Sequence, residues 1–362
     1  QGGFTGGGVN AVTRSGTNKW EGSVYHFTRD QDMVGDGPED SPLSEFSDET
    51  TGFRVGGPII KDRAFVFVNA EITRRDQPSD FLIDGSGTDR DFGHVEEAQR
   101  FRDILQNTYG YDPGGFGEFI RKTDSDKIFV RFDFNLTESH QLTVRHNFID
   151  AFNDVDRRSN FNFQFPDAQY MFQDETNSTV IQLNSSFGSF FNEARFTYQT
   201  IRDSRNGPTR FPSVQVSIPG GTLIAGTEQF STANSLDQDV IEFTNDLTWF
   251  TGDHTLVIGT HNEFFKFDNL FIRDNFGSYR FNSLDDFEQG IASRLDYSYS
   301  SDPSDPQKSS KFSVSQLGFY VSDEWAASTN LNITMGLRAD IPLMPDDPAA
   351  NPDVERVFGY AT

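Results

Sequence analysis

The chain has 362 residues, no cysteine and a formal net charge of −25, from 55 acidic and 30 basic residues. The lack of cysteine excludes disulfides, thiolate metal sites and a cysteine nucleophile, and the acidic balance argues against nucleic-acid binding, which calls for a basic surface. No run of about 18 apolar residues predicts a transmembrane helix, and the given residues contain no charged segment followed by an apolar one, as a signal peptide would.

The chain opens with a glycine-rich stretch, GGGVNAVTRSGTN, at residues 6–18. It has too much glycine for a helix and lacks the Gly-Lys-Ser/Thr of a phosphate loop. Residue 1 falls inside what reads as a folded motif, so we expect the sequence to be a piece of a longer protein.

An acidic segment follows at 30–50, with eight acidic residues and no basic one. It begins like a calcium loop, but Val34 stands where an oxygen ligand belongs. We therefore expect a solvated loop with at most weak binding of divalent cations, and we expect no cofactor.

Beyond this loop, apolar and polar residues alternate with the period of a β-strand. Between Lys127 and Thr137, for example, Ile128, Val130 and Phe132 fall on one face while Arg131 falls on the other. The pattern predicts about eleven strands, at 19–29, 51–59, 64–75, 125–136, 141–151, 176–188, 192–203, 238–250, 254–269, 311–325 and 331–340. Helical periodicity predicts a helix at 94–110 and a shorter one near Ser283.

The connections between these strands alternate between short turns and long loops. The long ones lie at about 30–50, 76–123, 152–173, 204–236 and 271–310. Such alternation, with strands that are apolar on one face, is typical of an antiparallel up-and-down transmembrane β-barrel in the outer membrane, with short periplasmic turns and long extracellular loops. A soluble β-sandwich or β-solenoid is the alternative, but a sandwich is not expected to keep this alternation through five cycles. Because bacterial single-chain barrels have an even number of strands, eleven strands indicate an incomplete barrel.

Several segments resemble a known family in their order along the chain. GGGVNAVTRSGTNKWEGSVYHFTRD is similar to the junction between plug and barrel in TonB-dependent outer-membrane receptors of the Oar-like group. FRVGGPIIKDRAFVFVNAE and LGFYVSDEWAASTNLNITMGLRAD resemble two of the family's hairpin regions.

The resemblance implies two domains: residues 1–17 as the C-terminal end of the plug with its linker, and residues 18–362 as the N-terminal half of a 22-stranded barrel. It also implies a location in the outer membrane of a Gram-negative bacterium, contact with lipid and lipopolysaccharide, and a TonB complex reached through a segment that the sequence lacks. The opening glycines would let the last plug strand pass close to the barrel wall; a surface hairpin loop is the alternative.

No catalytic arrangement stands out, and we expect that the chain is not an enzyme. Charged side chains on the polar faces of the strands are predicted to face the lumen, where they contact the plug or, alternatively, a substrate path. They are Arg131, Asp133, Arg145, Arg195, Glu242, Asp246, Arg338 and Asp340. Four aromatic residues near strand ends, Trp20, Tyr25, Trp249 and Trp325, are predicted at the membrane interface, although they would also suit ligand stacking.

These features favour a receptor that binds a substrate at its extracellular loops and imports it with energy supplied through TonB. The alternative is an adhesive or structural surface protein that uses the barrel as an anchor. The sequence leaves the substrate open.

Overall fold

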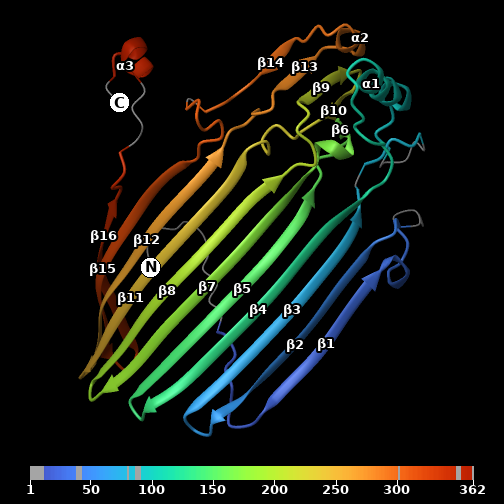
Figure 1. Cartoon of the computed structure of the whole chain (residues 1–362). Coiled ribbons are helices and arrows are strands. Elements are labelled where there is room, and N and C mark those ends of the chain that lie inside the picture. Colours follow the sequence, from blue (N-terminus) through green and yellow to red (C-terminus); the bar gives the residue numbers. More distant parts are fainter. Residues whose placement is uncertain are drawn as a thin grey trace.

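The computed structural model describes residues 12–37, 43–79, 81–85, 91–300, 302–347 and 352–360. Its main element is one antiparallel sheet of eleven strands (Figure 1). These strands are β1 (Glu21–Asp30), β2 (Ser47–Ile60), β3 (Ala64–Pro78), β4 (Ile120–Thr137), β5 (His140–Val155), β7 (Tyr170–Phe187), β8 (Phe190–Asn206), β11 (Asn234–Thr251), β12 (His254–Phe271), β15 (Ser310–Ser328) and β16 (Leu331–Leu343).

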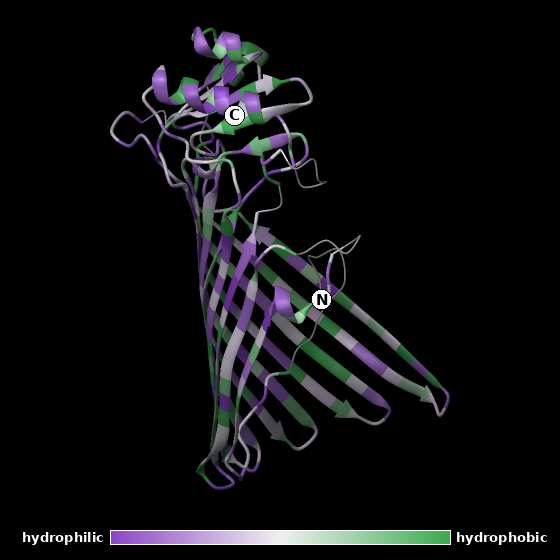
Figure 2. Ribbon diagram, turned by 90° about the vertical axis from the view of Figure 1, so that its right-hand side faces the viewer, coloured by the Kyte–Doolittle hydropathy of each residue, from purple (hydrophilic) through white to green (hydrophobic). Residues whose placement is uncertain are grey.

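The strands follow one another across the sheet in chain order, which confirms the predicted up-and-down topology. Each predicted strand corresponds to one of the eleven, and most extend a few residues beyond the predicted bounds. The sheet is curved and open at its edge strands β1 and β16 (Figure 2). A closed barrel of 22 strands remains a prediction.

Short turns join the strands at one end of the sheet and long connections join them at the other (Figure 1). The β4–β5 turn, for example, has only the two residues 138–139, whereas β3 and β4 are separated by residues 79–119. The predicted alternation of connection length is therefore present in the structure.

The two faces of the sheet differ in chemistry because side chains alternate along each strand. One face, here called the charged face, carries Arg131 and its cross-strand neighbours Phe67 and Arg145. The opposite, apolar face presents large side chains to the surroundings, including Val24 at 81% exposure and Leu337 at 79%. Bands of alternating hydropathy run across the strands in Figure 2. Such a surface suits contact with hydrocarbon.

The long connections fold into a cap above the strand ends, formed by the described parts of 79–119, 156–169, 207–233 and 272–309 (Figure 1). It contains a second sheet of five strands in the order β14-β13-β9-β10-β6. Its elements are α1 (Val95–Asn107), β6 (Asn162–Gln164), β9 (Ser213–Ile218), β10 (Gly221–Ala225), β13 (Ser278–Phe281), α2 (Leu284–Glu288) and β14 (Arg294–Asp296). A third helix, α3 (Pro352–Phe358), lies near the end of the chain.

The cap has a hydrophobic core of its own. Phe101 of α1 is fully buried, with ring centroids 5.4 Å from Phe165 and 5.3 Å from Phe287. Val216 and Leu223 of the small sheet are also fully buried. Both predicted helices are present, and within the described residues no helix has the length and apolar character to cross a bilayer.

Candidate functional site

All eight charged residues predicted to face the lumen lie on the charged face. The register shows this directly, because paired residues point to the same side of a sheet. Arg131 pairs with Arg145, Glu242 pairs with Glu263, and two residues along from Glu242, Thr244 pairs with Arg195. Asp246, Arg338 and Asp340 follow by the same alternation. Their roles as plug or substrate contacts stay predictions.

The structure gathers part of this set into a cluster on β4 and β5. Arg131 donates from Nε and Nη2 to the Asp133 carboxylate at 2.8–3.1 Å. Thr143 donates to the same carboxylate at 2.7 Å, and Asp133 is only 3% exposed. Buried charges persist where they are paired and hydrogen-bonded, so this network fixes the direction of the Arg131 guanidinium.

A second cluster lies near the other edge of the sheet. The Tyr320 hydroxyl donates to Asp246, and the Arg338 guanidinium lies 5.2 Å from the centroid of the Tyr320 ring. Arg338 also pairs with Asp340 at 2.7 Å. Gly259 makes room for this arrangement, since a Cβ there would lie 2.2 Å from the Asp246 carboxylate. Arg145 on β5, Arg195 on β8 and Glu242 on β11 belong to neither cluster.

The segment that precedes β1 crosses the charged face and is held there by Arg131. The remaining Nη1 of Arg131 donates to both the backbone carbonyl and the hydroxyl of Thr13, at 2.8 Å each. Gly16 is buried against the sheet backbone, and a Cβ at this position would lie 2.4 Å from the Val66 carbonyl oxygen. Only glycine permits so close an approach.

Asn18 fastens the end of this segment to the β2–β3 turn. Its amide donates to the Asp62 carboxylate at 2.5 Å, and its carbonyl accepts from the Asp62 backbone N–H at 2.8 Å. Asp62 has a left-handed backbone, with φ of 64°, which places both groups toward Asn18. We call residues 12–18 with their contacts on β2–β4 the junction. The glycines at 6–8, which drew attention in the sequence, lie outside the described residues.

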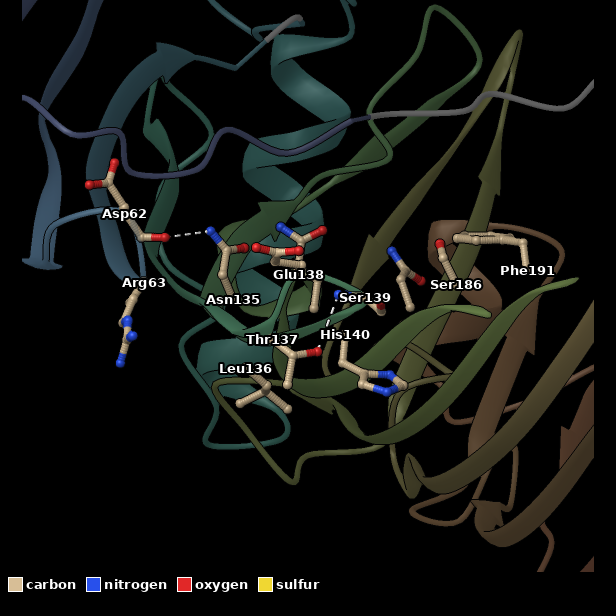
Figure 3. A pocket seen from close by; sticks show the side chains of 12 residues that line it. Asp62, Arg63, Asn135, Leu136, Thr137, Glu138, Ser139, His140, Ser186 and Phe191 are labelled. Carbon is tan, nitrogen blue, oxygen red and sulfur yellow. Dashed lines mark hydrogen bonds between the residues drawn. The ribbon is translucent and has the colours of Figure 1, made fainter. Parts of the chain in front are cut away.

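Two hollows adjoin the junction. One of about 900 Å³ is lined by the junction segment with Arg54 and Phe67 of the charged face. The other, of about 740 Å³, lies at the turn end of the sheet (Figure 3). There the Asn135 amide donates to the Asp62 carbonyl at 2.8 Å. Among the described residues no group of three histidine or carboxylate side chains is arranged to hold a metal ion.

One of the four aromatic residues predicted at the membrane interface, Tyr25, does not lie on the apolar face. Tyr25 is on the charged face, where its hydroxyl donates to Glu71 at 2.9 Å. The alternation explains the difference, because residues 20 and 25 are separated by an odd number of positions and cannot share a face of one strand. Trp249 and Trp325 lie on the apolar face near the short turns, and the ring of Trp20 packs over Gly57.

Arg158 joins two of the connections within the cap, 79–119 and 156–169. It is 6% exposed, lies between the rings of Phe119 and Phe163, and donates to the carbonyls of Gln164 and Phe81 at 2.8 and 2.9 Å. Burial lowers the pKa of Arg158 to about 10. The guanidinium remains charged at neutral pH and cross-links the cap.

Asp167 is a second buried link in the cap. It accepts from the Tyr111 hydroxyl and the Gly226 N–H, both at 2.7 Å and both on Oδ2. Its Oδ1 is buried without a hydrogen-bond partner. Burial raises the pKa of Asp167 to about 7, although its hydrogen bonds act in the opposite direction. Burial also raises the pKa of Tyr111.

Sequence reasoning did not find the cap sheet or its buried polar links. A local signal existed for β9 and β10: Val214, Val216 and Ile218 alternate, and Pro219-Gly220 marks a turn before Leu223. Arg158 and Asp167 carry no such signal, since their roles depend on residues from other connections.

A protein family described as "Outer membrane beta barrel domain" matches residues 12–85 and 116–351. The chain belongs to this family. This confirms the predicted location in the outer membrane of a Gram-negative bacterium, and it agrees with the prediction that the chain is not an enzyme. A search of curated proteins gave no match.

Solved structures with the same fold include the outer membrane transporter YddB from Escherichia coli, with 12% identity and a TM-score of 0.57. The alignment covers 91% of this chain and 40% of YddB. The siderophore receptor PirA from Acinetobacter baumannii has 15% identity and a TM-score of 0.52, with 91% and 40% covered. FpvA from Pseudomonas aeruginosa, bound to a pyoverdine–iron complex, has 13% identity and a TM-score of 0.51, with 92% and 39% covered. The chain thus spans about 40% of the length of the structures it matches, and at these identities the likeness concerns the fold.

Proposed function

We propose that the chain is part of a TonB-dependent outer-membrane receptor of the Oar-like group, which binds a substrate at its extracellular cap and imports it. In this proposal residues 1–17 are the end of a plug, and residues 18–362 are the first half of a 22-stranded barrel. The TonB complex acts through a segment upstream of this sequence, and the apolar face contacts lipid and lipopolysaccharide.

The junction is the observation that carries the proposal. A segment entering from the N-terminal side is held on the charged face by Arg131, by the close approach of Gly16 and by Asn18. A barrel that only anchors a surface protein has no need of such attachments. Arg145, Arg195 and Glu242, which belong to neither cluster, are available to hold the rest of a plug.

The test uses the complete gene in its native host. A deletion strain and a strain without TonB are compared for growth on a panel of scarce nutrients, each supplied alone. If the receptor proposal is right, both strains lose growth on the same nutrient. The complete gene then restores this growth in the deletion strain only. Unchanged growth of the deletion strain on every nutrient, together with lost attachment to surfaces, would instead establish the adhesive alternative.

A further inference from the structure

A polar cavity of about 320 Å³ lies where the cap meets the upper ends of β8, β11 and β12. Its volume is within the range of small-molecule sites. Of the described residues that line it, two are arginines, Arg205 and Arg210, six carry hydroxyl groups, three carry amides and none is acidic. A wall without carboxylates is unexpected in a chain whose net charge is −25.

The two arginines have no carboxylate partner in the described part of the chain. Arg205 lies over the rings of Tyr170 and Phe172, at 5.3 and 6.0 Å from their centroids. Arg210 lies 5.8 Å from the centroid of Phe276. Stacking on a ring holds a guanidinium in place and leaves its N–H groups available for a planar anion.

Arg202, three residues before Arg205 on β8, differs from the two arginines of the cavity because it has carboxylate partners. It is on the opposite face of the strand and pairs with Asp239 at 2.5 Å and with Asp237 at 3.7 Å. Among the described residues, Arg205 and Arg210 thus differ from Arg202 in having no carboxylate partner.

The hydroxyl groups of the lining add a second recognition element. Thr227 donates its proton to the carbonyl of Thr209 at 2.7 Å, and Ser231 donates to Glu228 at 2.7 Å. With their protons committed to the protein, these oxygens offer acceptors for the hydroxyl groups of a ligand. Glu228 itself is buried and is already used by Ser231 and by the Phe230 N–H.

We propose that this cavity binds a small hydroxylated carboxylate, with Arg205 and Arg210 holding the carboxylate and the hydroxyl oxygens of the lining holding the hydroxyl groups. The inference rests on the proposed receptor function and names the chemical class of its substrate. Bidentate arginine–carboxylate contacts give both strength and orientation to such a complex.

Binding is measured by calorimetry on the full-length receptor in detergent, with glucuronate, gluconate and citrate as probes and glucose as the uncharged match to glucuronate. We expect at least one acid to bind, and glucose to bind at least tenfold more weakly than glucuronate if glucuronate is that acid. Arg205→Gln and Arg210→Gln should each raise the Kd of the bound acid by about tenfold or more, as expected for charge-assisted hydrogen bonds. The double variant should not bind it.

Arg202→Gln is the matched control, because it removes the same charge from the same strand outside the cavity. Arg205→Lys keeps the charge without the bidentate fork and should retain part of the affinity. A circular dichroism spectrum identical to wild type shows that each variant is folded.

The inference is overturned if no acid binds to the wild-type receptor, or if the double variant binds as the wild type does. It is also overturned if Arg202→Gln weakens binding as much as the cavity variants. TonB-dependent growth on a nutrient without a carboxylate, combined with any of these outcomes, would leave the receptor function standing and remove only this substrate class.

Discussion

Asp167 makes the stability of the cap depend on pH, and Asp167→Asn should remove that dependence. The pKa of Asp167 is raised by burial from 3.8 to about 7. The folded cap therefore binds this proton more tightly than the opened cap does. The free energy of cap opening must then fall as pH rises from about 4 to about 7, and level off above that.

The size of the effect follows from the shift. A shift of roughly three pH units, at about 1.4 kcal/mol per unit, gives an upper value of about 4 kcal/mol. Asparagine keeps an oxygen that accepts from Tyr111 and Gly226 but has no charge to bury. We therefore expect the cap of Asp167→Asn to be more stable than wild type at pH 8, with the difference disappearing toward pH 4.

Hydrogen exchange on the full-length protein measures this, because it reports the local opening of the cap separately from the barrel. Amides of β6, β9 and β10 are followed at several pH values, after correction for intrinsic exchange rates. Asp112→Asn is the control: this exposed carboxylate has its pKa lowered, first by the Gly114 N–H, so its loss should not stabilise the cap at pH 8. Equal protection in wild type and Asp167→Asn at pH 8 would refute the reasoning.

Three further substitutions test the junction, the cap core and the apolar face. Gly16→Ala places a Cβ 2.4 Å from the Val66 carbonyl, so the junction should detach and trypsin should cleave after Arg14 faster than in wild type. Phe101→Ala removes a fully buried ring from the cap and should lower the free energy of cap opening by about 3–5 kcal/mol, measured by hydrogen exchange; unchanged protection would contradict the core assignment. Ile258→Arg, on the apolar face at 59% exposure, should cost about 2–4 kcal/mol of barrel stability in lipid bilayers, and equal stability there would argue against lipid contact.

The main sheet was predictable because its information is local. The alternation of apolar and polar residues around Ile128 and Arg131 predicts which residues share a face. A turn of two residues forces the strands on either side of it to pair with each other. The eight charged residues could therefore be assigned to one shared face without any knowledge of their partners, while the lumen that this face would line stays a prediction. Tyr25 was misassigned because its position near a strand end was weighed without the parity that separates it from Trp20.

The cap was not predictable in the same way. Its core brings Phe101, Phe163, Val216 and Phe287 together from four connections that are separated by whole hairpins. Pairings such as β9 with β13 and β6 with β10 are parallel and join different connections. No local sequence pattern predicts such contacts. The pairing of the barrel strands has already brought these connections close together, which lowers the entropic cost of contacts between them.

An acidic chain can hold a cavity that binds anions, because surface carboxylates and cavity arginines act on a bound anion from different distances. At physiological ionic strength the Debye length is about 8 Å, so exposed carboxylates farther than this from the cavity contribute little to the energy of a bound anion. Arg205 and Arg210 act at contact distance in a polar pocket where screening is weaker. The acidic surface slows the approach of an anion without deciding its affinity. The affinity is set by the guanidiniums of Arg205 and Arg210, which have no carboxylate partner among the described residues.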